Sequence, residues 1–382
     1  MNLKSKLGHF WRSIWEVVKW GYPARGLKVI GVTGTDGKTT TCHLIYDMFK
    51  EAGFKVALVS TVAAYIGSEE IDTGFHVTTP DAKFLQPFIK KAANAGMKYL
   101  VLETTSHGLD QHRVLGSNFF AGVITNITHE HLDYHQTFEK YRAAKAKLIR
   151  NSKFAVLNMN DSSFGYLKAR ARGQVIPFGK TKIRMSNPAL VGEYNRYNVG
   201  AAVAVAKILG IRYSVVSKVV KNFAGVPGRM EEIKLGQPFR AMVDFAHTPN
   251  ALEVLLRQLR KELPKSRNLI LVFGSAGLRD KLKRPMMGQI AARLADQVII
   301  TAEDPRTESL TEIYKQIAGS GPGFIREDNR QLAINKAVKS AKMGDIVVVT
   351  GKGHEKSMCF GKEELPWSDQ EAVKKAIKLV RD

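Results

Sequence analysis

The chain has 382 residues and a formal net charge of +23 at pH 7, with 44% hydrophobic residues. This length is enough for two or three domains with their own cores. The charge favours an anionic partner, either a phosphorylated substrate or a membrane surface, and no arginine-rich run or aromatic–basic interleaving singles out nucleic acid. Two distant cysteines, Cys42 and Cys359, argue against a disulfide scaffold and a cysteine-ligated zinc and fit a reducing cytoplasm.

The first predicted segment, residues 1–27, is an amphipathic helical extension that ends at Gly21 and Pro23. We favour a helix docked on the protein's own core, and the alternative is contact of residues 1–22 with an anionic membrane or a partner protein. No run reaches the roughly 18 apolar residues of a membrane span, and charged residues interrupt any signal-peptide pattern. The apolar stripe consists of Leu3, Leu7, Phe10, Trp11, Ile14, Trp15 and Val18.

From Lys28 onward, apolar runs alternate with helical stretches, which is typical of parallel sheets covered on both faces. The Gly/Pro turn in "GVPGRMEEI" (225–233) marks a boundary between two α/β domains, predicted as 28–224 and 225–382. The strands expected before and after this boundary are "KVIGVTG", "KVALVST", "KYLVLE", "FAGVITN", "RAMVDF", "NLILVF", "DQVIIT" and "DIVVVT".

The stretch "GVTGTDGKTT" (31–40) lies between a predicted strand and a predicted helix, where backbone N–H groups can surround a phosphate. Lys38 can bridge the outer phosphates and Thr39 can bind Mg²⁺. Val32 occupies the position of the first glycine of the usual pattern. The placement still predicts a nucleoside triphosphate site, made by Gly34, Thr35, Asp36, Gly37, Lys38, Thr39 and Thr40.

The dense polar stretch "HEHLDYH" (129–135) fails the zinc-protease pattern H-E-x-x-H, because Asp133 replaces the second histidine. Taken alone, it is best interpreted as a polar loop with helix-capping residues.

Ten short motifs follow one another along residues 28–382 in the order given below. Together they resemble the Mur ligase family, and within it the tripeptide-synthetase (MurE) type. The motifs are "TGTDGKTT", "ETTSHGLDQHRV", "HEHLDYH", "YRAAKAKLI", "GEYNRYN", "PGRMEE", "VDFAHTPNALE", "LRDKLKRPMMG", "EDPR" and "GKGHE".

The resemblance implies a P-loop-type central ATPase domain with a mainly parallel sheet, followed by a Rossmann-like C-terminal α/β domain. It implies an ADP-forming ligase of peptidoglycan precursor synthesis that uses ATP and Mg²⁺ and forms an acyl phosphate. The expected partners are a UDP-N-acetylmuramyl dipeptide and a diamino acid, and the expected state is a cytoplasmic monomer.

The same resemblance assigns the residues around ATP. Glu103, His131 and Lys145, the last carbamylated, would bind a second Mg²⁺ besides the one at Thr39. Asn195 and Asn198 would lie near the adenine, Arg229 near a phosphate and Asp244 near the ribose. Two departures are Glu130, where the family usually has Asp, and Asp36, where Asn is usual.

The resemblance also assigns the two substrates. Thr78, Thr79, Thr105 and Arg113 would contact the muramyl dipeptide. The incoming amino acid would meet Arg279, Asp304, Arg306, Gly351 and Glu355. Arg306 of the family motif that reads meso-diaminopimelate is kept, so we favour meso-diaminopimelate. Asp304 replaces the asparagine of that motif, so lysine or another diamine stays open.

The largest departure is at the N-terminus, where about 27 residues precede the first strand instead of a UDP-holding domain of about a hundred residues. The basic surface could hold the nucleotide, a partner could supply a domain, or the acceptor could lack UDP. The chain could also be a related ligase acting on a non-UDP acidic acceptor, or a non-catalytic ATP-binding scaffold. Retention of Lys38, Glu103, His131 and Lys145 counts against a scaffold.

Overall fold

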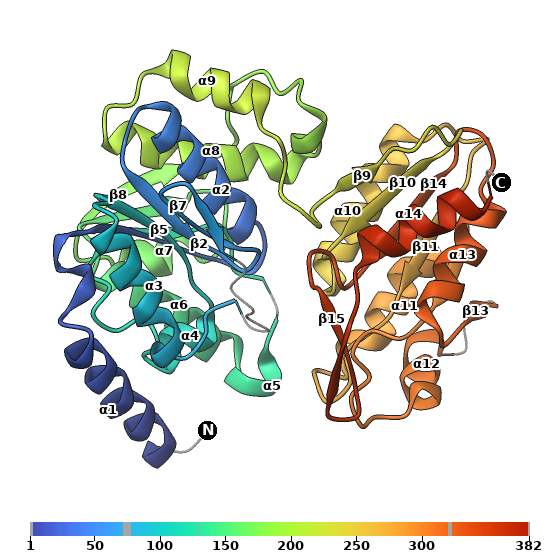
Figure 1. Cartoon of the computed structure of the whole chain (residues 1–382), viewed down its shortest axis with the longest axis horizontal. Coiled ribbons are helices and arrows are strands. Elements are labelled where there is room, and N and C mark those ends of the chain that lie inside the picture. The colour runs from blue at the N-terminus through green and yellow to red at the C-terminus, as the bar shows by residue number, and fades with distance from the viewer. Residues whose placement is uncertain (1–2, 72–77, 129, 320–322, 381–382) are drawn as a thin grey trace. The chain divides into compact units, whose positions relative to one another are not determined.

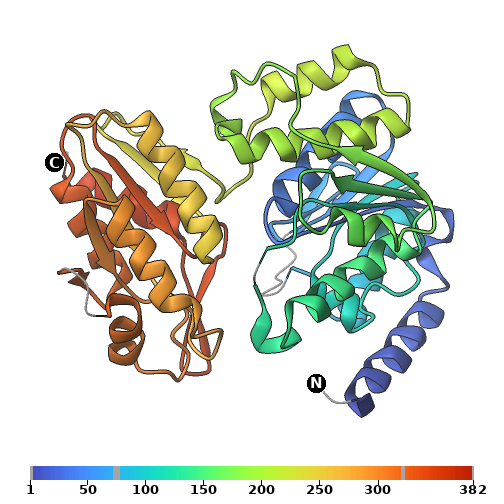
Figure 2. The same ribbon diagram turned by 180° about the vertical axis from the view of Figure 1, so that it is seen from behind.

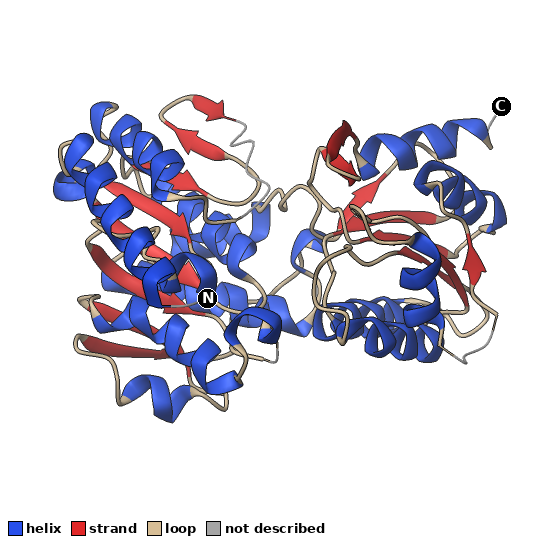
Figure 3. Ribbon diagram, turned by 90° about the horizontal axis from the view of Figure 1, so that it is seen from below, coloured by secondary structure: helices blue, strands red, loops and turns tan. Residues whose placement is uncertain are grey.

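The structure is a computed structural model that describes residues 3–71, 78–128, 130–319 and 323–380. Residues 1–2 of the predicted extension and His129 of "HEHLDYH" lie outside the described residues. The chain forms two compact units, Met1–Ala224 and Gly225–Asp382 (Figure 1). Both have helices on the two faces of a mainly parallel sheet (Figure 3), which confirms the predicted α/β class.

The first unit is built on an eight-stranded sheet in the order β4-β3-β2-β5-β1-β6-β7-β8. All pairs are parallel except β2 with β3 and β3 with β4, so the antiparallel strands form one edge. The strands are β1 (Lys28–Thr33), β2 (Val56–Val59), β3 (Ala64–Ile66), β4 (Glu69–Ile71), β5 (Tyr99–Glu103), β6 (Phe119–Ile124), β7 (Phe154–Asn158) and β8 (Gln174–Phe178).

Apolar residues fill both faces of the central strands because helices cover both. Helices α3 and α6 pack against side chains such as Val29 and Leu102, while α2 and α8 cover the other face (Figures 1 and 2). The helices are α1 (Leu3–Lys19), α2 (Lys38–Glu51), α3 (Ala82–Asn94), α4 (Ser106–Asp110), α5 (Leu132–His135), α6 (Phe138–Arg150), α7 (Phe164–Lys168), α8 (Glu193–Ile208) and α9 (Tyr213–Asn222), with short 3-10 turns η1 (Pro23–Gly26) and η2 (Pro188–Leu190).

The second unit has a six-stranded sheet in the order β13-β12-β11-β14-β10-β9, in which only β9 is antiparallel. A hairpin, β15–β16, stands apart from it. The strands are β9 (Glu231–Ile233), β10 (Arg240–Asp244), β11 (Leu269–Phe273), β12 (Gln297–Ile300), β13 (Ile325–Arg326), β14 (Ile346–Thr350), β15 (Ser357–Phe360) and β16 (Glu363–Pro366).

Alternation along the strands divides the core of this unit into two layers. Leu269 and Leu271 of β11 face helices α10, α11 and α12, whereas Ile270 and Val272 face α13 and α14. The helices are α10 (Pro249–Glu262), α11 (Lys283–Leu294), α12 (Leu310–Ala318), α13 (Arg330–Ser340) and α14 (Asp369–Leu379).

The N-terminal helix α1 docks on the first unit, but not through the whole predicted stripe. Ser13, Glu16 and Val17 are buried there. The expectation that Leu3, Leu7, Phe10, Trp11, Ile14, Trp15 and Val18 all face the core is therefore wrong for Leu7, Trp11, Trp15 and Val18, which are exposed. The helix docks instead through the neighbouring side that carries Ser13, Glu16 and Val17.

Candidate active site

The predicted phosphate loop connects the carboxyl end of β1 to the first turn of α2. Gly37 caps this helix with a φ of 80°, a left-handed conformation that favours glycine. A Cβ at this position would lie 2.1 Å from Oδ1 of Asn198 on α8, so no larger residue fits. The loop thus places the N–H groups at the start of α2 at the edge of the sheet, where an anion can bind.

The turn after β6 fixes the middle of the loop. The backbone N–H of Asp36 donates to Oδ1 of Asn126 (2.9 Å), and Oγ1 of Thr125 donates to the carbonyl of Asp36 (2.7 Å). The neighbouring Thr35 accepts a hydrogen bond at Oγ1 from the N–H of Thr128 (2.9 Å). Each contact joins residues about ninety positions apart, so the fold rather than the local sequence sets the loop's shape.

Two lysines meet at the carbonyl oxygen of Gly34. Lys38 Nζ donates to it at 3.1 Å and to the carbonyl of Thr35 at 2.8 Å. Lys145 Nζ, from α6, donates to the same Gly34 oxygen at 2.6 Å and is buried. Burial, and then the nearby charge of Lys38, lower the pKa of Lys145 well below its usual range. The structure therefore favours an amine at this position that readily loses its proton.

An oxygen pair lies beside the loop. Thr39 Oγ1 donates to Oε1 of Glu103 at 3.0 Å, while the N–H of Thr61 donates to Oε2 at 2.9 Å. Glu103 ends β5 and is buried. Hydroxyl and carboxylate oxygens are the ligands that Mg²⁺ prefers. Among the described residues no group of three or more His, Cys, Asp or Glu side chains is arranged to hold a metal ion.

Tyr141, which sequence reasoning missed, links the loop to the histidine motif. Its hydroxyl lies 2.9 Å from Oγ1 of Thr35, and Lys145 Nζ lies 4.6 Å from its ring centre. The ring centre of His131 lies 6.2 Å from the ring centre of Tyr141. Burial raises the pKa of Tyr141 well above its usual value, so the hydroxyl stays protonated. Its position four residues before Lys145 on a helix was the available signal.

His131 lies at a strained turn that opens α5. Its φ is 55°, and its Nε2 is 3.6 Å from a carboxylate oxygen of Glu130. Its ring packs edge-on against His107 at 4.8 Å. Such left-handed non-glycine residues are costly and cluster at functional sites. Tyr141 thus lies between His131 and the two residues Thr35 and Lys145 of the phosphate-loop region.

The two predicted adenine contacts are both buried on α8. Asn198 Nδ2 donates to Oδ1 of Asn195 (2.9 Å), and Asn195 Nδ2 donates to the carbonyl of Val191 (3.0 Å). Because Asn198 also lies against Gly37, this pair is continuous with the phosphate loop. Thr40, which was predicted as part of the phosphate site, lies within the first turn of α2.

Three of the predicted dipeptide contacts form one cluster. Arg113 Nη1 donates to the carbonyl of Thr79 (2.6 Å), and the N–H of Thr105 donates to Oγ1 of Thr79 (2.8 Å). Thr105 Oγ1 in turn caps α4 by accepting from the N–H of Gly108 (3.0 Å). Thr78 directly precedes this cluster and is half-buried. The cluster lies beside the end of β5, because Thr79 Oγ1 is 3.4 Å from the carbonyl of Glu103.

In the second unit, the predicted ATP contacts lie at the carboxyl end of β10. Asp244 accepts hydrogen bonds from the N–H groups of Met230 and Ala246, both at 2.7 Å. The guanidinium of Arg229 lies 4.5 Å from the ring centre of Phe245. The Met230 contact thus brings Asp244, at the end of β10, next to Arg229, which precedes β9.

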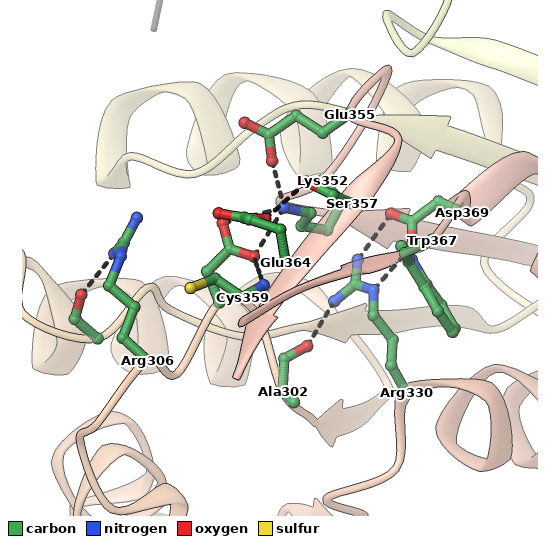
Figure 4. A network of polar contacts seen from close by, with 12 residues as sticks. Ala302, Arg306, Arg330, Lys352, Glu355, Ser357, Cys359, Glu364, Trp367 and Asp369 are labelled. Atoms are coloured by element: carbon green, nitrogen blue, oxygen red, sulfur yellow. Dashed lines mark hydrogen bonds and ion pairs between the residues drawn. The ribbon is translucent and has the colours of Figure 1, made fainter. Parts of the chain in front are cut away.

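Asp304, which departs from the family motif, forms an ion pair with Lys352. Lys352 Nζ, almost fully buried, donates to both carboxylate oxygens of Asp304 (2.8 and 2.9 Å) and pairs with Glu355 (2.5 Å). The N–H of Cys359 on β15 also donates to Asp304 (2.9 Å). Figure 4 shows the contact between Lys352 and Glu355. The carboxylate that replaces the family's asparagine is therefore paired within the protein, with a lysine that it shares with Glu355.

Arg306 is held beside this network. Its Nη1 donates to the carbonyl of Gly277 (2.7 Å), which uses one of its five N–H donors (Figure 4). Its backbone N–H donates to the carbonyl of Cys359 (3.1 Å), which fixes a φ of 53°. Arg279 of the neighbouring loop is exposed. Both guanidinium groups thus belong to loops at the carboxyl edge of the second sheet.

Glu303 is the second residue that sequence reasoning missed. It is buried, and a Cβ on Gly351 would lie 2.1 Å from its Oε2. This oxygen has no hydrogen-bond partner among the residues that the structure describes. Burial raises the pKa of Glu303 from 4.5 to about 7, although Lys283, Arg330 and Lys352 oppose the change. A carboxyl group that titrates near neutral pH therefore lies beside Gly351 of the predicted amino-acid site.

Comparison with known families assigns both units. The profile described as "Mur ligase middle domain" matches residues 32–186, and that described as "Mur ligase, glutamate ligase domain" matches residues 228–353. Together these two matches cover most of the chain.

Curated relatives match over nearly the whole chain. The UDP-N-acetylmuramoyl-L-alanyl-D-glutamate--2,6-diaminopimelate ligase of Thermosynechococcus vestitus is 39% identical, over 94% of this chain and 78% of the relative. The protein of the same name from Aquifex aeolicus is 37% identical, over 94% and 79%.

Solved structures agree with this assignment. A structure of a UDP-N-acetylmuramoyl-L-alanyl-D-glutamate--2,6-diaminopimelate ligase is 30% identical, with a TM-score of 0.61, over 94% of this chain and 80% of that one. E. coli FolC in complex with DHPP and ADP has a TM-score of 0.73 at 18% identity, over 97% and 93% of the two chains. The FolC likeness shows the fold alone.

Proposed function

Because this chain belongs to the Mur ligase family, we propose that it joins meso-diaminopimelate to UDP-N-acetylmuramoyl-L-alanyl-D-glutamate at the expense of ATP, as a step of peptidoglycan precursor synthesis. The names of its relatives support this acceptor and this amino acid. The observation that carries the proposal is the group around Gly34, in which Lys38 and Lys145 share one carbonyl oxygen. Thr39 and Glu103 form an oxygen pair beside the same loop.

The proposed reaction has two steps. An oxygen of the acceptor carboxylate attacks the γ-phosphorus of ATP, and ADP leaves, which produces an acyl phosphate. The amine of the incoming amino acid then attacks the acyl carbon, phosphate leaves, and the nitrogen loses a proton. Both steps gather negative charge, so the main contribution of this chain is fixed positive charge and N–H donors at the loop. Lys38 is the residue that would contact the γ-phosphoryl group during its transfer.

The residues present fit Mg²⁺, which would be held by Thr39 and Glu103, with His131 and a carbamate of Lys145 as further ligands. Bound Mg²⁺ would neutralise phosphate charge during the transfer. A neutral lysine amine adds CO₂ to give a carbamate and a proton. The lowered pKa of Lys145 supplies the neutral amine, and the conversion places a negative charge beside the ammonium of Lys38. The Lys145–Tyr141 contact would hold the carbamate stem in place.

Selection of the amino acid is proposed for the second unit. Arg306 can form a fork on a distal carboxylate, which diaminopimelate has and lysine lacks. Glu355 would meet the distal ammonium, while Arg279 and Gly351 complete the pocket. Both oxygens of Asp304 accept hydrogen bonds from Lys352, so this carboxylate is engaged within the protein and is not available to attract a plain cation such as lysine. This pairing supports diaminopimelate over lysine.

We propose that the protein acts in the cytoplasm as a monomer, with the ATP-site and substrate residues all supplied by one chain. Both cysteines are free and buried, which fits a reducing compartment. Among the described residues no helix has the length and apolarity needed to cross a bilayer.

The acyl phosphate can be tested by isotope transfer. With heavy oxygen in the acceptor carboxylate, one labelled oxygen should appear in the released phosphate, since the attacking oxygen leaves with phosphorus. Lys38→Met should abolish both the transfer and the product. Product formation with unlabelled phosphate would contradict an acyl phosphate and leave the ligase assignment standing.

A further inference from the structure

Helix α1 presents an apolar stripe to solvent. Leu7, Trp11, Trp15 and Val18 have exposed fractions of 50%, 65%, 65% and 46%. Their spacing of four, four and three residues puts them on one side of the helix. Two tryptophans that are two-thirds exposed on adjacent turns are unusual on the surface of a soluble protein. This exposed stripe therefore indicates a surface that binds another molecule.

The opposite side of α1 is fixed, so the stripe cannot turn inward. Val17 is 4% exposed and fills the space beside Gly116, which leaves no room for a Cβ there. The ring of Phe10 packs edge-on against His112 at 5.2 Å, and His9 lies 3.9 Å from Asp81. The helix projects from the edge of the first unit in Figures 1 and 2. The protein therefore holds the helix with its tryptophans outward.

The charges around the stripe are positive. Within α1 the only acid is Glu16, which is buried on the docked side. The side chains of Arg12 and Lys19 are 61% and 50% exposed, and each lies 3.8 Å from a less exposed carboxylate, that of Asp81 and that of Glu16 respectively. Lys4 and Lys6 precede them in the same helix. This side of the first unit thus combines tryptophan with lysine and arginine and carries no exposed acid on the helix.

A neighbouring element also exposes an aromatic ring. On α3, which packs beside α1, Phe84 is 55% exposed and Lys83 Nζ lies 5.7 Å from its ring centre. Tyr22, just after α1, is also 55% exposed. Aromatic rings with adjacent ammonium groups occur where proteins meet the headgroup region of a bilayer. The apolar and basic character is therefore not confined to one helix.

We propose that the exposed face of α1 docks on an anionic lipid surface, with Trp11 and Trp15 inserted among the headgroups and Arg12 and Lys19 against lipid phosphates. An anionic bilayer complements the net charge of +23, whereas a second copy of this chain would be repelled by it. The helix would lie in the plane of the interface, because the structure has no described helix able to span the membrane. The proposal is independent of the proposed ligase reaction.

Vesicle flotation of the full chain tests this proposal. The wild type should float with phosphatidylcholine vesicles that contain phosphatidylglycerol and bind pure phosphatidylcholine at least about tenfold less tightly. The double variant Trp11→Ser/Trp15→Ser should bind the anionic vesicles at least about tenfold less tightly than the wild type. Tyr213→Ser, which removes a ring 67% exposed on α9, is the matched control and should float like the wild type.

Further readouts distinguish a lipid occupant from a protein occupant. A blue shift of tryptophan fluorescence with anionic vesicles, lost in the double variant, would support insertion of these two rings. Equal flotation of wild type and double variant would overturn the proposal. So would concentration-dependent dimers of the wild type, absent in the double variant, with no flotation, because the stripe would then be a protein interface. Unchanged circular dichroism would show that the double variant folds.

Discussion

The buried carboxyl group of Glu303 should make the stability of the second unit depend on pH. Its pKa is raised from 4.5 to about 7, with burial as the main cause. Its Oε2 has no hydrogen-bond partner among the described residues, so ionisation there is poorly compensated. The perturbation to make is Glu303→Gln, which has nearly the same shape and stays neutral at every pH.

The sign and size follow from linkage. The pKa is higher in the folded state than in the unfolded state, so the folded state binds this proton more tightly. The stabilisation is complete below about pH 4.5 and is lost as the pH rises through about 7. At about 1.4 kcal/mol per pKa unit, the loss amounts to about 3 kcal/mol. The free energy of unfolding of the wild type, minus that of Glu303→Gln, should fall by this amount.

Hydrogen exchange of amides in β11 and β14, measured in the full chain, reports the free energy of opening of this unit alone. Wild type and variant are compared at each pH between about 5 and 8, so that the intrinsic pH dependence of exchange cancels. Glu312→Gln gives the effect of the same replacement on the exposed surface of α12. A wild-type-minus-variant difference that stays constant over this range would refute the assigned burial penalty.

Three further predictions concern the candidate site. Lys145→Ala should abolish turnover, while ATP binding measured by calorimetry persists. Added acetate, which substitutes for the carboxylate of the carbamate, should restore part of the turnover. The turnover of Lys147→Ala, on the same helix, should stay within about threefold of wild type. Unchanged turnover in Lys145→Ala would exclude the carbamate. Tyr141→Phe loses the hydroxyl that meets Thr35, so the KM for ATP should rise about fivefold, as expected for one hydrogen bond, and an unchanged KM would disprove this positioning role. Asp304→Asn should retain the preference for diaminopimelate over lysine within about threefold, because Lys352 already engages this carboxylate, and a reversed preference would show that Asp304 reads the substrate directly.

Much of the fold could be predicted because its signals are local. The Val/Ile/Leu runs of β1, β5, β11 and β14 are buried on both faces, and such runs indicate parallel strands. The position of Lys38 after a strand and before a helix predicted the loop that the structure shows. Glu103 could be expected beside it, because the carboxyl ends of parallel strands meet at one edge of a sheet.

Other features could not be predicted because they depend on contacts between distant residues. The pairing of Asp304 with Lys352 joins positions 48 residues apart, and the sequence alone showed only an unusual acid. The burial of Tyr141 under Lys145 depends on how α6 meets the loop. Docking of α1 through Val17 depends on Gly116, which no periodicity in the helix itself could reveal.

The central claim is that this chain catalyses the ligation, and it is tested most directly by product formation. Purified protein is given ATP and Mg²⁺ with UDP-N-acetylmuramoyl-L-alanyl-D-glutamate, alone or with meso-diaminopimelate, L-lysine or L-ornithine. Phosphate release is measured and products are weighed by mass spectrometry. We expect the diaminopimelate tripeptide, with phosphate release that requires both acceptor and amine. ATP binding without a tripeptide from any amine would contradict it and point to an acidic acceptor without UDP or to a non-catalytic ATP-binding protein.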